Sequence, residues 1–159
     1  MLFYVTPHYV LWCALPPHKL VKYLQVISVI IFLSLLYIML KYIVSAINLV
    51  LVDFIYLNLI KDFFVNQIKK VQGTEVKMNY TGAILCYLFL VLGINYFIIY
   101  QKKSILDAFL LGLLIYGVYE TTNYTLFSKW SFTTVVIDTL WGGILFAITT
   151  FITRYFFPN

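Results

Sequence analysis

Charged residues are scarce in this 159-residue chain. Asp, Glu, Lys and Arg make up 11% of it and hydrophobic residues 63%, whereas soluble domains carry about 25% charged and about 45–50% apolar residues. This shortage excludes a water-exposed surface over most of the molecule. The 11 basic residues outnumber the 6 acidic ones, but they fall between apolar segments, which is typical of helix ends at a membrane. The composition predicts an all-α integral membrane protein whose surroundings are the lipid bilayer, with no nucleic-acid partner.

Histidine and cysteine are also scarce. The two histidines, His8 and His18, precede the long apolar segments, which excludes a histidine-rich redox-metal site within those segments. Cys13 and Cys86 lack the spacing of a metal site or a disulfide. The chain has no Ser–His pair, phosphate-binding glycine loop or nucleotide fingerprint. Any metal or cofactor therefore stays unknown, and the sequence favours a role other than catalysis.

Long apolar runs are abundant. Residues 81–99, 105–122 and 132–153 each come close to the ~20 residues that a membrane-spanning helix requires. The link before them, residues 61–80, is the longest polar stretch between apolar segments. Its first half has the pattern of an interfacial amphipathic helix, and a solvated loop is the alternative.

The apolar run at residues 23–60 is too long for one crossing. Its only charge is Lys41, and a single helix would reach about 57 Å, about twice the hydrocarbon core. We therefore predict two helices, 23–40 and 42–60, with a turn near Lys41. One long helix is the alternative, because no Gly or Pro marks the turn.

These segments predict a four-helix membrane domain at residues 39–159. Residues 1–38 form an N-terminal extension that carries the additional helix at 23–40. With five crossings, seven lysines gather on the side of the N-terminus and four basic residues on the other, so the positive-inside rule predicts a cytoplasmic N-terminus in a multi-pass protein. Homo-oligomer formation stays open.

Acids inside apolar segments are the most informative feature. Asp53, Glu120 and Asp138 lie in three different predicted helices, and an intramembrane carboxylate costs on the order of 2.5–3.5 kcal/mol on insertion scales. The predicted topology brings all three acids near the same membrane face. Aromatic and amide side chains accompany them at helical spacings of three and four. The candidate site consists of Asp53, Tyr56, Tyr116, Tyr119, Glu120, Asn123, Asp138 and Trp141.

No Lys or Arg lies within these segments to pair with the acids, so they need a proton, hydrogen-bond donors, or a bound cation or amine. We expect a pocket for a lipid headgroup or a cation, with Asp53 and Asp138 as charged ligands and Glu120 as the acid nearest the membrane face. Such a protein would be a carrier or an accessory to lipid modification. The alternative is a structural membrane protein whose buried acids join helices by hydrogen bonds. An enzyme ranks last, because neither a nucleophile nor a metal set accompanies the acids.

Other polar or small residues have simpler explanations. Ser104 and Asp107 have the spacing of a capping box at a helix start. Trp130 at a segment boundary fits the aromatic belt of membrane proteins. Four glycines most simply allow close helix approach: Gly112, Gly117, Gly142 and Gly143.

The motifs around the acids resemble those of a family of small predicted membrane proteins known as domain of unknown function 2177. The resemblance covers about residues 39–153 and rests on Asp53 with Tyr56-Leu57, and on Tyr116-Gly117, Tyr119-Glu120, Thr122-Asn123, Trp130, Asp138, Trp141 and Gly142. Family members are mostly bacterial with four predicted helices, so the resemblance implies a four-helix core. Tyr56 stands where the family often has Trp, Glu120 where it often has Asp, and residues 1–38 are typically lacking. The family implies no established activity.

Overall fold

The computed structural model describes residues 16–158, which form helices and links with no strand among them. Four helices in this part of the chain are long and apolar enough to cross a membrane, namely Lys19–Leu59, Tyr80–Tyr100, Ile105–Leu126 and Phe132–Phe156. The prediction of an all-α membrane protein is confirmed. Residues 1–15 of the predicted extension lie outside the described residues.

Helix α2 runs without interruption from Pro17 to Leu59, 43 residues or about 65 Å at 1.5 Å per residue. The predicted turn near Lys41 is therefore wrong, and the alternative of one long helix holds. The physical reason is local. No Gly or Pro interrupts the hydrogen-bonding pattern, and adding a residue to an existing helix costs little once it has been nucleated.

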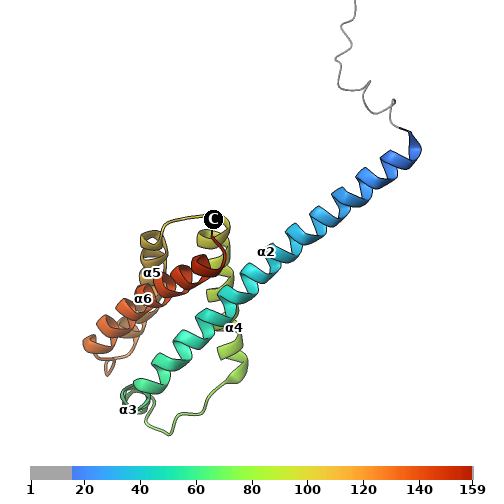
Figure 1. Ribbon diagram of the computed structural model, residues 1–159. Coiled ribbons are helices and arrows are strands. Elements are labelled where there is room, and N and C mark those ends of the chain that lie inside the picture. Colours follow the sequence, from blue (N-terminus) through green and yellow to red (C-terminus); the bar gives the residue numbers. More distant parts are fainter. Residues whose placement is uncertain (1–15, 159) are drawn as a thin grey trace, which may run out of the picture. The chain divides into compact units, whose positions relative to one another are not determined.

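The chain divides into two compact units, residues 1–40 and 41–159, and each is described by itself. The described part of the first unit is the beginning of α2, whose residues 21–40 are all exposed. The second unit holds the rest of α2 and the elements shown in Figure 1. These are α3 (Lys61–Gln72), α4 (Tyr80–Ile94), the π-helix η1 (Asn95–Tyr100), α5 (Ile105–Leu126) and α6 (Phe132–Phe156).

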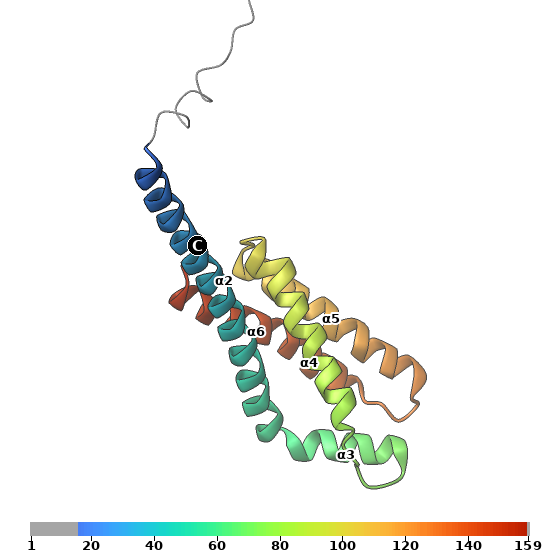
Figure 2. The ribbon, with the colours of Figure 1, turned by 90° about the vertical axis from the view of Figure 1, so that its right-hand side faces the viewer.

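The helix expected in the first half of the 61–80 link is present as α3, which turns away from the end of α2 in Figure 2. It ends at Gly73, whose φ of 73° is a left-handed conformation that glycine adopts at little cost. Its buried residue, Gln67, donates from Nε2 to the backbone oxygen of Lys129 at 2.8 Å. This bond ties α3 to the link between α5 and α6.

Close packing between α5 and α6 depends on three glycines. A methyl group at Gly112 would overlap the backbone oxygen of Gly142, and one at Gly142 would overlap the ring of Tyr116. A methyl group at Gly143 would lie 2.7 Å from Cε2 of Phe109. Small residues let membrane helices approach closely, where van der Waals contact holds them together. The role predicted for these glycines is confirmed, as is the capping box, since Ser104 and Asp107 bond reciprocally.

The continuous α2 also changes the charge count used for orientation. Without a crossing at Lys41, Lys19 and Lys22 are no longer counted with the 61–80 link. Within residues 41–159, five lysines (Lys61, Lys69, Lys70, Lys77, Lys129) then face four basic residues (Lys41, Lys102, Lys103, Arg154) across the membrane. This margin no longer favours either side, and the cytoplasmic N-terminus stays a prediction.

Candidate functional site

Asp53 joins three helices. Its Oδ2 accepts a hydrogen bond from the hydroxyl of Tyr87 on α4 at 2.7 Å, and its Oδ1 accepts one from Nε1 of Trp141 on α6 at 2.8 Å. The carboxyl group is buried. Because each oxygen has a donor, the cost of burying this acid is largely offset.

Tyr56 lies one helical turn beyond Asp53 and reaches the second acid. Its hydroxyl donates to Oδ1 of Asp138 at 3.4 Å, a long hydrogen bond. Its ring stacks on Trp141 with centroids 3.9 Å apart and an angle of 9° between the planes. The aromatic pair therefore lies beside both Asp53 and Asp138.

Glu120, on α5, is the most buried of the three acids, at 0% exposed. Its Oε2 accepts from Nε1 of Trp130 at 2.8 Å, while Oε1 is buried without a donor. The Glu120 side chain is in hydrogen-bonding contact with the Asp138 side chain. Such a contact between two carboxyl groups is attractive only when one of them carries a proton, since two carboxylates repel.

Positive charge is lacking around these acids. In the described part of the chain, none of the three has an ion pair, and the recorded salt bridge joins Lys69 to Glu75 on α3 and the link after it. Asp138 is close enough to both Asp53 and Glu120 for their charges to act on it. Among residues 16–158, no three His, Cys, Asp or Glu side chains gather as metal ligands do. The acids thus form a negatively charged cluster whose partners are aromatic donors.

The structure gathers five of the eight predicted site residues around this cluster: Asp53, Tyr56, Glu120, Asp138 and Trp141. Asn123 lies one turn beyond Glu120, and its Nδ2 is buried without a partner. Tyr116 instead packs against Gly142 and the apolar core. Tyr119 is 60% exposed and is not brought to the acids, because it lies on another face of α5 from Glu120.

Two hydrogen-bond donors in the cluster are not among the predicted residues. Trp130 is buried against Glu120 rather than free to anchor at the membrane surface. Its fixed spacing from Asn123 and Asp138 in the family motif was the signal that could have assigned it. Tyr87 donates to Asp53 but lies in an apolar segment without any polar neighbour that would single it out.

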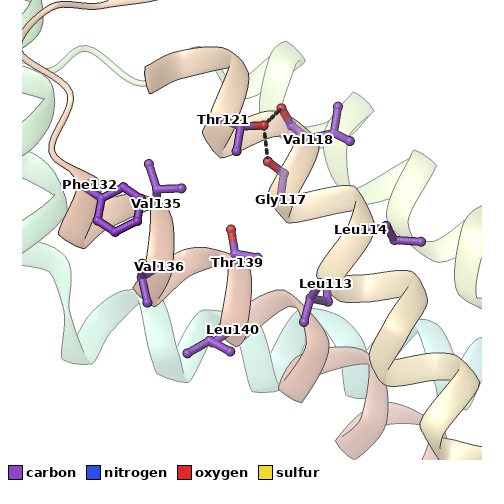
Figure 3. A pocket seen from close by; sticks show the side chains of 10 residues that line it. All are labelled: Leu113, Leu114, Gly117, Val118, Thr121, Phe132, Val135, Val136, Thr139 and Leu140. Carbon is purple, nitrogen blue, oxygen red and sulfur yellow. Dashed lines mark hydrogen bonds between the residues drawn. The ribbon is translucent and has the colours of Figure 1, made fainter. Parts of the chain in front are cut away.

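A separate groove of about 440 Å³ lies between α5 and α6 (Figure 3). Apolar side chains dominate it, including Leu113, Val135 and Leu140. The hydroxyl of Thr121 bonds back to the carbonyls of Gly117 and Val118. None of the three acids lines the groove, so it is distinct from the acidic cluster.

Comparison with known proteins gives one match. The family model described as "Predicted membrane protein (DUF2177)" matches residues 37–155. This range includes all three acids and the aromatic donors around them, and it agrees with the resemblance seen in the sequence motifs. No curated protein and no solved structure matches the chain.

Proposed function

We propose that this chain, which belongs to the predicted membrane protein family DUF2177, binds a positively charged group at Glu120 and Asp138. The group is the ammonium of a lipid headgroup or a small cation. Binding of this kind would suit a carrier or an accessory to lipid modification. The observation that carries the proposal is the buried, unpartnered Oε1 of Glu120 next to a second carboxyl group, with no basic side chain paired to either.

Physical chemistry explains why this arrangement favours a cation. Two adjacent buried carboxyl groups share a proton or require an external positive charge. A bound ammonium would donate to Glu120 and Asp138 and replace that proton. Asn123, with its unpartnered Nδ2 one turn away, is available to orient an acceptor group on the same ligand.

Asp53 takes a different role in this proposal from the one its sequence position suggested. Both of its oxygens already accept hydrogen bonds from Tyr87 and Trp141, which leaves less capacity for a ligand. We assign it to holding α2, α4 and α6 together, next to the binding pair. Tyr56 and Trp141 then form the aromatic wall between Asp53 and the pair, in keeping with their stacking.

The alternative, a structural protein with acids as interhelical hydrogen-bonding groups, is favoured by the same contacts of Asp53. Interhelical hydrogen bonds in membranes average about 0.6 kcal/mol, so three such acids would contribute modestly. In this reading Glu120 and Asp138 share a proton permanently, and no ligand is needed.

Native mass spectrometry of the full chain, together with its thermal unfolding midpoint, separates these functions. The delipidated protein is titrated with phosphatidylethanolamine, with phosphatidylglycerol, and with Na⁺ or K⁺ alone. We expect phosphatidylethanolamine or one of the cations to bind the wild type and raise its unfolding midpoint. Glu120→Gln and Asp138→Asn should bind at least about ten-fold more weakly.

Asp62→Asn is the matched control, since it neutralises an exposed acid on α3 and should bind like the wild type. Equal binding by Glu120→Gln and the wild type would overturn the proposal. So would a wild type that takes up neither the amine lipid nor a cation while Glu120→Gln merely unfolds at a lower temperature, which is the structural outcome.

A further inference from the structure

Helices α2 and α6 carry a second polar region away from the acids. Asp53 contacts Trp141, and Tyr56 contacts Asp138, so three residues forward on α2 correspond to three residues back on α6. The two helices are antiparallel in this register. Continued in the other direction, the same register sets Ser45 at the level of Thr149 and Lys41 at the level of Thr153.

Positive charge gathers at this end of the second unit. Lys41 lies close enough to Lys102 and Arg154 for their charges to repel one another. The acid near Arg154 is Asp107, which is exposed and whose carboxylate already accepts from the backbone and hydroxyl of Ser104. Three cations therefore meet one partly occupied carboxylate, which leaves a positive local charge.

Two fully buried threonines at this end leave their hydroxyls unused. Thr149 and Thr150 are 0% exposed, and neither Oγ1 has a hydrogen-bond partner. Hydroxyls in helices ordinarily bond to the carbonyl four residues back. Five others in this chain do so: Ser34, Thr121, Thr122, Thr125 and Thr153. The two exceptions are turned away from the backbone acceptor that was within reach.

The unpartnered atoms of this region share one property, because each can donate a hydrogen bond. Besides the two threonine hydroxyls, they are Nδ2 of Asn48 and Nη2 of Arg154, both buried. Asn48 lies one turn beyond Ser45 on α2, and helical side chains lean toward the N-terminus, which brings Arg154 over the turn of Thr150. Donors without acceptors, among like positive charges, match an anion rich in acceptor oxygens.

We infer that the Lys41–Arg154 end of the α2–α6 pair is a binding site for a phosphate-type anion, either the phosphate of a membrane lipid or a free phosphate ion. Arg154 supplies the charge-assisted bond and Lys41 and Lys102 the surrounding field. Thr149, Thr150 and Asn48 supply neutral donors. This site is independent of the cation site proposed at Glu120 and Asp138, and it lies toward the opposite end of the α2–α6 pair.

The test compares the full-length wild type with a Thr149→Val, Thr150→Val double variant, because valine keeps the shape of threonine without its hydroxyl. Delipidated protein is titrated with phosphatidylglycerol, diacylglycerol or inorganic phosphate, and unfolding midpoints and retained ligand are measured. We expect phosphatidylglycerol or phosphate to stabilise the wild type, and the double variant to bind about ten-fold more weakly. Without ligand, the double variant should be at least as stable as the wild type, since it removes two unpaired buried hydroxyls.

The matched control is the double variant Thr121→Val, Thr125→Val, whose hydroxyls are exposed and bonded to their own helix. It should bind like the wild type. Stabilisation by phosphatidylglycerol alone identifies a lipid phosphate, and stabilisation by inorganic phosphate identifies a free ion. Equal binding by the wild type and the Thr149→Val, Thr150→Val variant, or equal stabilisation by diacylglycerol, would overturn the inference and leave the basic residues as surface anchors.

Arg154→Gln provides a second variant should the threonine changes disturb folding. It should also weaken phosphate binding, whereas Glu120→Gln should leave it unchanged. An effect of Glu120→Gln as large as that of Arg154→Gln would indicate a general loss of structure and contradict two independent sites.

Discussion

The two ends of the α2–α6 pair differ in which atoms lack partners. At the acidic end, acceptors predominate: three carboxyl groups meet donors from Tyr87, Trp130 and Trp141, and one Glu120 oxygen lacks a donor. At the basic end, the unpartnered atoms are donors. Between the two regions lie fully buried apolar side chains, Leu49, Leu145 and Phe146. The same pair of helices thus carries two opposite polar regions separated by an apolar layer.

The largest expected effect comes from breaking both ends together. Gly112→Ala places a methyl group against the backbone of Gly142, which cannot rotate away as a side chain can. Overpacking of this kind should cost about 3 kcal/mol or more. Because it displaces α6, it should abolish ligand stabilisation at both ends. Unfolding midpoints in detergent would measure the loss.

Gly82→Ala is the control for this substitution, because the nearest atom to its new methyl group lies at an ordinary contact distance of 3.7 Å. It should change stability by less than about 0.5 kcal/mol. Similar losses from Gly82→Ala and Gly112→Ala would contradict the close approach of α5 and α6.

The next largest effect should come from Asp53→Leu. This change leaves the Tyr87 hydroxyl and the Trp141 Nε1 buried without their acceptor, at a cost of about 1–3 kcal/mol. Asp53→Asn should cost less, because its amide keeps one acceptor and the Tyr87 hydroxyl can reverse to accept. Equilibrium unfolding of both variants gives the comparison, and equal losses would contradict the bonding assigned to Asp53.

A smaller effect should come from Trp130→Phe, which removes one donor from Glu120. We expect a loss of about 1 kcal/mol. A double-mutant cycle with Glu120→Gln measures the coupling directly. Additive losses in the cycle would mean that the Trp130–Glu120 bond contributes nothing, and the acidic end would then owe its stability to Asp53.

The smallest effect should come from Gln67→Ala, which frees the Lys129 carbonyl at the edge of the bundle and should cost about 0.5 kcal/mol. Amide hydrogen exchange should increase in α3 and in the link at Lys129. Both ligand sites should be unaffected. A change in ligand binding at either end would show that α3 takes part in a site.

Much of this architecture follows from the sequence. Hydropathy and length locate α4, α5 and α6, and the periodicity of polar residues turns Asp138 and Glu120 inward. The turn at Lys41 was wrong because bilayer thickness was given more weight than backbone chemistry, which had no reason to break the helix there. The bilayer limits how much of a helix it can cover, but it does not limit the length of the helix.

The partners of the acids were harder to predict. Trp130 and Tyr87 each combine an apolar ring with a single donor, a combination that suits a membrane surface and a buried hydrogen bond equally well. Only the packing of one helix against another decides between them. The unpaired donors at Thr149 and Thr150 leave no trace in the sequence either, because a rotamer choice rather than a residue type distinguishes them from Thr153.

The long apolar α2 has a consequence for how the chain enters the bilayer during synthesis. Asp53 is made 34 residues before Tyr87 and 88 residues before Trp141, so it first meets lipid without either donor. On insertion scales, roughly six to ten large apolar residues offset one Asp. The segment Lys19–Leu59 contains far more than that, with a mean hydropathy of 2.4, the highest among the four candidate spans of the described chain. The first helix can therefore insert ahead of the others and hold its acid ready for the helices that follow.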